Sequence, residues 1–484
     1  MNTSLINLEM CVIGLGLVLM LADLFVAPER RRFIAYIAIL ALGFLLAVSF
    51  SGNGSCSIAG TAFHGEFIND GLSLFFKRFF LVAAILVLFI AAEFSDRIVA
   101  AAEYYSLIIF ALAGMLFAAS SNDFAMLFVS IELITITFYV LVSFQRGKLT
   151  SLEAGVKYLI LGALSSAFMI FGIALIWGTT GTLNFTELAA IAPQFVDSKI
   201  FLLGVLLLLV GLGFKIAAFP FQIWAPDVYQ GAPTPTTAFL AVGSKAAGFV
   251  LLLRVLFTAV PAVTVRWSTL LIIISGITIL YGNLCALPQR NLKRIFGYSS
   301  IAHAGYLLLG IAALNASGQA AILYYLAGYL FTVLAGFLVI ALVLRHLETE
   351  DIAGLSGLNE RSPLLAATMA ISMASLAGIP PLAGFFGKFL LLKAVVEAAQ
   401  IPGNHCYYYL VFVALAGVVI SFYYYLGVIR AMYWSREATD LSPIKLSAPA
   451  MVTAWICIAG MFWIGIFPNT LLNMANAAVT ALKI

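Results

Sequence analysis

Residues 200–214 read IFLLGVLLLLVGLGF, an unbroken run of apolar side chains and glycine. A membrane-spanning β-strand would alternate apolar and polar residues over about ten positions, but this run is apolar on every face for longer than that. A lipid bilayer admits only helices and closed barrels, because only these satisfy their own backbone hydrogen bonds. The run therefore predicts a transmembrane helix.

The composition of the whole chain indicates the same surroundings. Of 484 residues, 63% are apolar and only 10% are charged, and the mean hydropathy is +1.09. Soluble domains carry roughly 25% charged residues, so the composition excludes a cytosolic protein and makes the lipid bilayer the expected solvent. The net charge of +4 gives no reason to expect a nucleic-acid partner.

Apolar runs between prolines, glycines and charges predict an all-α polytopic membrane protein. A transmembrane helix takes about 20 residues, so the chain has room for about 14 such helices. The predicted spans are 4–27, 33–50, 71–93, 105–120, 124–144, 154–178, 200–224, 236–259, 268–287, 297–314, 319–344, 363–397, 406–430 and 448–470.

The distribution of lysine and arginine predicts the orientation. Fourteen of these residues lie in loops that follow odd-numbered spans, whereas three lie in the even loops and the C-terminal tail. Because cytoplasmic loops are enriched in positive charge, the odd loops are expected in the cytoplasm, and both termini are expected on the outer side.

The five cysteines indicate no metal or redox centre. No CxxC and no Cys/His spacing suits zinc or an iron–sulfur cluster, so neither a metal nor a cofactor is expected in this chain. Cys56 and Cys406 are both expected on the outer side, and a disulfide between them stays an open possibility, because a sequence does not show whether their Cα atoms approach.

Three lysines stand well inside predicted spans: Lys215, Lys245 and Lys388. A charge at that depth costs several kcal/mol unless it is paired or hydrated, so such residues are candidates for an ion pathway. The alternative is that they form ion pairs between helices. Five other cations lie within about two turns of a span end, where long side chains reach the headgroups: Lys77, Arg78, Lys157, Arg254 and Lys393.

Glu132 is the one acidic residue near the centre of a predicted span. A carboxylate beside an ammonium favours both charged forms, whereas desolvation favours the neutral lysine. Separating such a pair would release a proton from the lysine, which makes Glu132 and a buried lysine a candidate proton-transfer element. His303 titrates near neutrality and is a candidate relay, although a lone histidine can equally be a hydrogen-bonded core residue.

Two spans are predicted to be broken near their lysines. Pro220 follows Lys215, and Gly378, Pro380 and Pro381 precede Lys388. Proline removes a backbone donor and frees a carbonyl, and broken helices at matching places in two halves indicate the ion site of an inverted-repeat transporter. The broken spans are fourth in spans 4–8 and fourth in spans 9–13. Because five is odd, two consecutive units of this size lie inverted in the membrane.

This pattern predicts four segments. Residues 1–100 form an N-terminal three-helix segment, residues 101–262 the first inverted repeat, residues 263–435 the second inverted repeat, and residues 436–484 a C-terminal helix.

Several motifs, in this order, resemble the antiporter-like membrane subunits of respiratory complex I. They are SIELITI (130–136), SLEAGVKY (151–158), GFKIAAFPFQIWAPDVYQGAPTP (213–235), SKAAGF (244–249), NLKRIFGYSSIAHAGY (291–306) and SLAGIPPLAGFFGKF (375–389). The resemblance covers spans 4–13. Within the family, WAPDVYQGAP looks like the subunit N branch, which corresponds to subunit 2 of mitochondria.

The resemblance implies a subunit of a proton-translocating NADH:quinone oxidoreductase in a bacterial inner membrane. NADH, FMN, iron–sulfur clusters and quinone would belong to partner subunits, and the partners would be other membrane subunits of complex I. Carried over by motif, Glu132 would tune Lys215, Lys245 would link two half-channels, and Lys388 would pass the proton outward. Lys157 and His303 match the family as residues of second rank.

One departure and two alternatives remain. Gln222 stands where many relatives have histidine, and an amide orders water but does not titrate. Lys388 in span 12, and the lack of a long amphipathic helix after span 14, favour the subunit N branch. The alternatives are a subunit of a multi-subunit Na⁺/H⁺ antiporter, against which DVYQGAP argues, and a non-pumping scaffold of the membrane arm.

Overall fold

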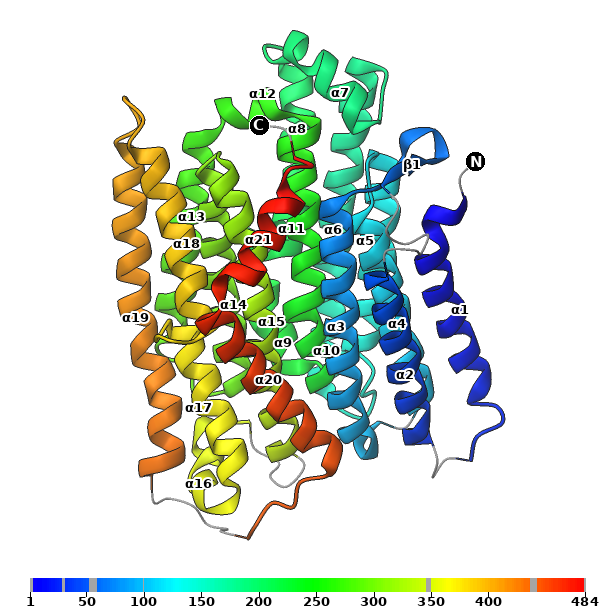
Figure 1. Ribbon diagram of the computed structural model, residues 1–484, viewed down its shortest axis with the longest axis vertical. Helices are drawn as coiled ribbons and strands as arrows, with labels where there is room; N and C mark the ends of the chain where they lie inside the picture. The colour runs from blue at the N-terminus through cyan, green and yellow to red at the C-terminus, as the bar shows by residue number, and fades with distance from the viewer. Residues whose placement is uncertain are drawn as a thin grey trace.

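The chain folds into a bundle of long helices that run up and down about a common axis (Figure 1). This computed structural model describes residues 3–27, 31–51, 59–98, 100–344, 350–435 and 442–482. In these ranges, thirteen helical segments are long and apolar enough to cross a membrane. The two strands, β1 (Gly60–Ala62) and β2 (Phe67–Asn69), form a small antiparallel hairpin that pairs Gly60 with Asn69.

The long helices follow the predicted spans closely. They are α1 (Asn7–Ala22), α2 (Arg31–Phe50), α3 (Gly71–Glu93), α4 (Ala101–Ala119), α5 (Phe124–Val142), α6 (Leu149–Thr180), α8 (Lys199–Ile216), α13 (Ser268–Ala286), α14 (Leu292–Ala312), α15 (Ala316–Leu344), α19 (Cys406–Trp434) and α20 (Ala448–Ile466). The eighth span, Thr234–Ala259, contains α10 (Thr234–Phe239) and α11 (Lys245–Arg254), each followed by a π-helical turn.

Shorter helices complete the chain. They are α7 (Phe185–Ile191), α9 (Trp224–Gly231), α12 (Pro261–Arg266), α16 (Leu358–Arg361), α17 (Pro363–Ala377), α18 (Ala383–Ala399) and α21 (Pro468–Val479). The predicted span 363–397 is therefore two helices, α17 and α18. The prediction for α6 was too short, since its polar first turn, LTSLE, continues the helix beyond the apolar run.

Both predicted breaks are present. Helix α8 ends at Ile216, and Ala217 adopts a left-handed conformation with φ of 58°. Helix α17 ends at Ala377, and Gly378 takes φ of 93°, a region that glycine enters without the steric cost of a Cβ. Lys215 lies in the last turn before its break, whereas Lys388 lies in the second turn after its break. The two lysines thus approach the breaks from opposite sides.

Two sets of five spans can be matched in order. The first set is α4, α5, α6, α8 with α9, and α10 with α11; the second is α13, α14, α15, α17 with α18, and α19. An odd number of spans in each set makes the two sets run in opposite senses. The boundaries 101–262 and 263–435 stay a prediction, because no break in the bundle marks them.

The centre of the bundle is formed by the eighth span, α14 and α15. The apolar window of the eighth span is 100% buried and those of α14 and α15 are 94% buried, whereas those of α2, α6 and α19 are 33% buried. The buried helices carry Lys245 and His303, so these polar groups lie deep within the protein. Apolar packing excludes water around them, which raises the strength of every charge interaction there.

Candidate functional site

The three lysines of the prediction are all buried in the bundle. Lys215, Lys245 and Lys388 are 4%, 3% and 4% exposed. They come from α8, the first position of α11, and α18. Each ammonium is hydrogen-bonded, and within the described residues none of the three lies within 4.0 Å of a carboxylate.

Lys215 meets α5 one turn away from Glu132. Its Nζ donates to Thr135 Oγ1 at 2.5 Å, while the Glu132 carboxylate accepts a hydrogen bond from Ser166 Oγ on α6. The negative charge of Glu132 still acts on the ammonium of Lys215. Lys215 is therefore bonded to a hydroxyl one turn from Glu132, and in the described residues no direct ion pair joins the two members of the expected pair.

Helix α8 approaches α11 closely at Gly248. A Cβ at this position would lie 2.8 Å from Ile216 Cγ2 and 3.5 Å from Lys215 Cβ. The missing side chain lets the helix that carries Lys215 pack directly on the helix that carries Lys245.

Lys245 bonds to α14 through Ser300. Its Nζ donates to the Ser300 carbonyl oxygen at 2.5 Å and to the Ser300 hydroxyl, which also bonds the hydroxyl of Tyr229 at 2.9 Å. A π-helical turn, Leu240–Ser244, immediately precedes Lys245. Such turns often occur at functional sites.

His303 lies one turn beyond Ser300 on α14, with both ring nitrogens bonded. Nδ1 bonds the hydroxyl of Tyr325, and Nε2 bonds the hydroxyl of Tyr425 at 3.0 Å. Its neighbours contact both lysines: Lys245 bonds Ser300 one turn earlier on α14, and the His303 ring centroid lies 6.1 Å from that of Tyr306, over which Lys388 lies. The imidazole can pass a proton between two hydroxyls by exchanging tautomers.

The ammonium of Lys388 reaches back from α18 to the break between α17 and α18. Its Nζ donates to the carbonyl oxygens of Leu376 and Ala377 at 2.7 and 3.1 Å, and it lies 5.1 Å from the ring centroid of Tyr306. The last carbonyls of a helix have no partner within the helix. The break that Pro380 and Pro381 cause thus provides the acceptors for the ammonium.

Lys157 lies apart from this buried row. Its side chain is 44% exposed and forms ion pairs with Glu153 and Asp227, both at 2.8 Å. Asp227 on α9 also bonds Arg294 Nη1 at 2.7 Å. Partial burial acts to raise the pKa of the Asp227 carboxyl, but the hydrogen bonds and charges of Lys157 and Arg294 hold it below its usual value. Sequence patterns gave no signal for Asp227 beyond the DVYQGAP motif.

Gln222 lies in the break after α8 and is 3% exposed. Within the described residues, its buried Oε1 has no hydrogen-bond partner. This oxygen can accept a hydrogen bond from water but cannot titrate.

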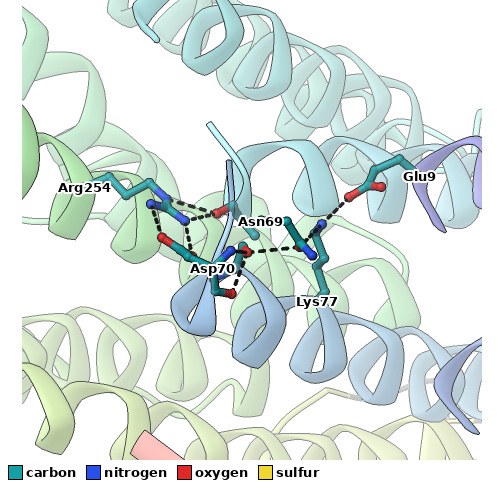
Figure 2. Close-up of polar contacts among 7 residues, drawn as sticks. Glu9, Asn69, Asp70, Lys77 and Arg254 are labelled. Atoms are coloured by element: carbon teal, nitrogen blue, oxygen red, sulfur yellow. Dashed lines mark hydrogen bonds and ion pairs between the residues drawn. The ribbon is translucent and has the colours of Figure 1, made fainter. Parts of the chain in front are cut away.

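Two of the five cations expected at the headgroups are instead buried in ion pairs. Lys77 is 3% exposed and lies 2.9 Å from Glu9 Oε1, and Arg254 is 2% exposed and lies 2.9 Å from Asp70 Oδ1 (Figure 2). The expectation for these two was wrong because depth along a span does not reveal a carboxylate on another helix. Lys393, in contrast, has a side chain that is 57% exposed, as expected.

Cysteines and metal ligands add nothing to the site. Within the described ranges, Cys406 is a free thiol, and no three His, Cys, Asp or Glu side chains converge as metal ligands. Cys56, the other half of the possible disulfide, lies outside the described residues.

Known proteins resemble the chain over its full length. A family model described as NADH:quinone oxidoreductase/Mrp antiporter, transmembrane, matches residues 121–413. NADH-quinone oxidoreductase subunit N of Desulforamulus reducens is 39% identical over 99% of this chain and 98% of its own length. The protein of the same name from Heliobacterium modesticaldum is 40% identical over the whole of both chains.

Solved structures agree on the architecture. A chain of respiratory complex I from Thermus thermophilus with bound aureothin is 31% identical, with a TM-score of 0.80 over 97% of this chain and 99% of that one. A chain of the Mrp complex from Dietzia sp. DQ12-45-1b has a TM-score of 0.82 over 98% of both chains. At 22% identity, the second likeness concerns the fold alone.

Proposed function

The chain belongs to the NADH:quinone oxidoreductase/Mrp antiporter family of membrane subunits, and on that basis we infer that it is subunit N of a proton-translocating NADH-quinone oxidoreductase. It works with other membrane subunits of the complex. We further propose that NADH oxidation and quinone reduction take place in partner subunits, and that this chain carries the proton path with no redox centre of its own.

We propose that Glu132, Lys215, Lys245, His303 and Lys388 form the proton path. The observation that carries this proposal is the chemistry of the lysines' partners. Each ammonium is held by hydroxyl or backbone oxygens, which are neutral acceptors. A lysine held in this way can lose its proton without leaving a bare carboxylate beside it. A buried lysine that serves only the structure would be paired with a carboxylate and would keep its proton, because losing it would leave that carboxylate buried without a partner.

The order of the groups suggests how protons move. A shift of α5 toward Lys215 would bring Glu132 to the ammonium and favour the charged form, and a shift away would favour release. Lys245, bonded to Ser300, carries the path from the first set of spans to α14. In this scheme His303 links Lys245 with Lys388 and relays protons through the hydroxyls of Tyr325 and Tyr425, to which its ring nitrogens bond.

Lys157 keeps a second rank in this scheme. Its ion pair with Asp227 links α6 to α9, the short helix that follows the break after Lys215. We propose that this ion pair, at the half-exposed edge of the bundle, stabilises the conformation of the break after Lys215. The positive charge of the odd loops supports a cytoplasmic position for them, with both termini on the outer side of a bacterial inner membrane.

The other two functions are less well supported. The likeness to the Mrp chain is one of fold, whereas relatives with 39% and 40% identity over the full length bear the subunit N name. A non-pumping scaffold would be expected to place its buried lysines in ion pairs, and the described residues place these three against neutral acceptors.

The proposal is tested with Lys215→Ala in the assembled complex. The tagged chain is purified in mild detergent, and assembly is read from a native gel stained for NADH dehydrogenase activity. We expect the complex to assemble fully. NADH-driven proton uptake in inverted vesicles should fall tenfold or more, which corresponds to an increase of roughly 1.4 kcal/mol or more in the activation barrier. Lys393→Ala, which removes an exposed cation, is the matched control and should pump normally. Normal pumping in the assembled Lys215→Ala complex would overturn the proposal.

A further inference from the structure

A second group of buried charges lies outside the proton path. This N-terminal charge cluster consists of Glu9, Asn69, Asp70, Lys77 and Arg254 (Figure 2). Lys77 Nζ lies 2.9 Å from Glu9 Oε1 and donates to Asn69 Oδ1, also at 2.9 Å. Ser73 Oγ connects Asn69 with Asp70, and Asp70 bonds Arg254. The cluster thus ties α1 and α3 to the end of α11.

Arg254 has the best-satisfied charge of the cluster. Its Nη1 and Nη2 donate to the two carboxylate oxygens of Asp70 at 3.1 and 2.9 Å, and its Nε and Nη2 donate to the carbonyl oxygen of Ala119 at 3.0 and 2.8 Å. Such a planar fork fixes direction as well as distance. The guanidinium therefore locks the end of α11 against the start of α3 and the end of α4.

Asp70 is held equally firmly. Its Oδ1 accepts from the backbone N–H of Ser73 at 2.8 Å and caps the N-terminus of α3. Burial acts to raise the pKa of the Asp70 carboxyl, but the charge and hydrogen bonds of Arg254, with those of Ser73, bring it below its usual value. The Asp70 carboxyl is therefore ionised at neutral pH.

Helix α11 connects this cluster with the proton path. Lys245 is its first residue and Arg254 its last, and π-helical turns lie directly before and after it, at Leu240–Ser244 and Val255–Ala259. An α-helix turns by about 100° per residue, so the extra residue of a π turn changes the direction in which a side chain points. With such a turn at each end, the rotation of α11 is set by the anchors at its ends.

We propose that the Asp70–Arg254 ion pair is a positioning element for Lys245. It fixes the rotation of α11, so that Lys245 points at Ser300. Through Asn69 and Lys77, the same contacts extend to Glu9 on α1 and make the N-terminal helices part of this support. The inference rests on the proposed role of Lys245 in proton transfer.

The main alternative is that the cluster only holds the fold together. The two readings differ in how an Arg254 defect combines with a defect at the contact of Lys245. If Arg254 acts by holding Lys245 against Ser300, then losing both contacts should cost little more than losing one. Independent effects multiply instead.

The test uses the whole complex and four variants. Arg254→Lys keeps the charge but loses the fork, and Ser300→Ala removes the hydroxyl that Lys245 contacts. Proton uptake driven by NADH is measured for each, for the double variant and for Lys245→Ala, with assembly checked on a native gel. Arg266→Lys is the matched control, because Arg266 pairs with Asp197 at an exposed site on α12.

We expect proton uptake to fall about threefold in each single variant and also about threefold, and not about ninefold, in the double variant. A ninefold loss in the double variant, or normal pumping in assembled Arg254→Lys or Ser300→Ala, would overturn the inference. If Arg254→Lys does not assemble, Asp70→Asn, which retains the cap of α3, takes its place under the same criteria. Normal pumping in Lys245→Ala would instead overturn the proposed proton path.

Discussion

The buried cations of this protein form two groups that differ in their partners. Lys215, Lys245 and Lys388 are held by hydroxyl and carbonyl oxygens. Three buried cations outside the row are held by carboxylates: Lys77 by Glu9, Arg254 by Asp70 and Lys293 by Glu350. Arg361, an arginine that keeps its charge at any physiological pH, instead donates to the carbonyl oxygen of Ser442. Both groups bear the cost of desolvation, and in the proposed proton path only the first group changes charge. We propose that the type of partner, and not burial itself, separates a proton site from an ion pair that stays charged.

The largest effect on stability should come from breaking an ion pair. Lys77→Met strands the carboxylate of Glu9, which is 0% exposed, and we expect about 3–5 kcal/mol of lost stability, because an unpaired buried charge has no compensation. The measurement is the amount of chain in the membrane and the temperature at which the complex loses its activity band on a native gel. The double variant Glu9→Leu with Lys77→Met removes both charges and should recover most of the loss. A fully stable Lys77→Met complex would contradict the expectation that cations paired with carboxylates contribute more to stability than the three lysines with neutral partners.

A smaller effect on stability is expected in the row of lysines. Lys388→Met removes the charge together with its hydrogen bonds and leaves only the carbonyls of Leu376 and Ala377 without their donor. A buried neutral acceptor left unsatisfied costs about 1–3 kcal/mol, less than an unpaired buried charge. The complex should assemble with a small loss of thermal stability, while proton uptake per NADH oxidised falls. Thermal unfolding and proton uptake are measured on the same preparation. Loss of assembly with Lys388→Met would place Lys388 in the structural group.

The smallest effect is expected at the half-exposed pairs of Asp227. The carboxyl has a lowered pKa in the folded protein, so it contributes stability above its ordinary pKa, and this contribution is lost as the pH falls through the lower, folded value. Exposed ion pairs contribute about 0.2–1 kcal/mol, so Asp227→Asn should lower the unfolding temperature slightly at neutral pH. The difference from the unmodified protein should disappear in acid. A difference that grows toward low pH would contradict the sign of this shift.

The sequence was sufficient to predict the spans, the two breaks and the depth of the three lysines. Those features depend on local order: apolar runs of the right length, Pro220 and Pro381 within them, and charges counted from the ends of each run. The structure places Lys388 against the carbonyls that its own break frees, which is the local relation that proline predicts.

Contacts between distant segments were beyond the sequence. Arg254 and Asp70 are 184 residues apart, and neither their depth nor their spacing indicates that they meet. Glu9 lies near the start of the predicted span 4–27, and nothing in its surroundings in the sequence indicates that Lys77 on α3 pairs with it. The π turns around α11 were also missed, because they depend on how the buried helix packs and not on a residue type such as proline.

The central claim is that lysines with neutral partners move protons, whereas cations with carboxylate partners keep their charge and hold helices in position. The most direct test is the number of protons taken up per NADH oxidised, measured in inverted vesicles that contain assembled Lys215→Ala complex. The account predicts a reduced ratio with assembly intact. An unchanged ratio in the fully assembled complex would contradict it.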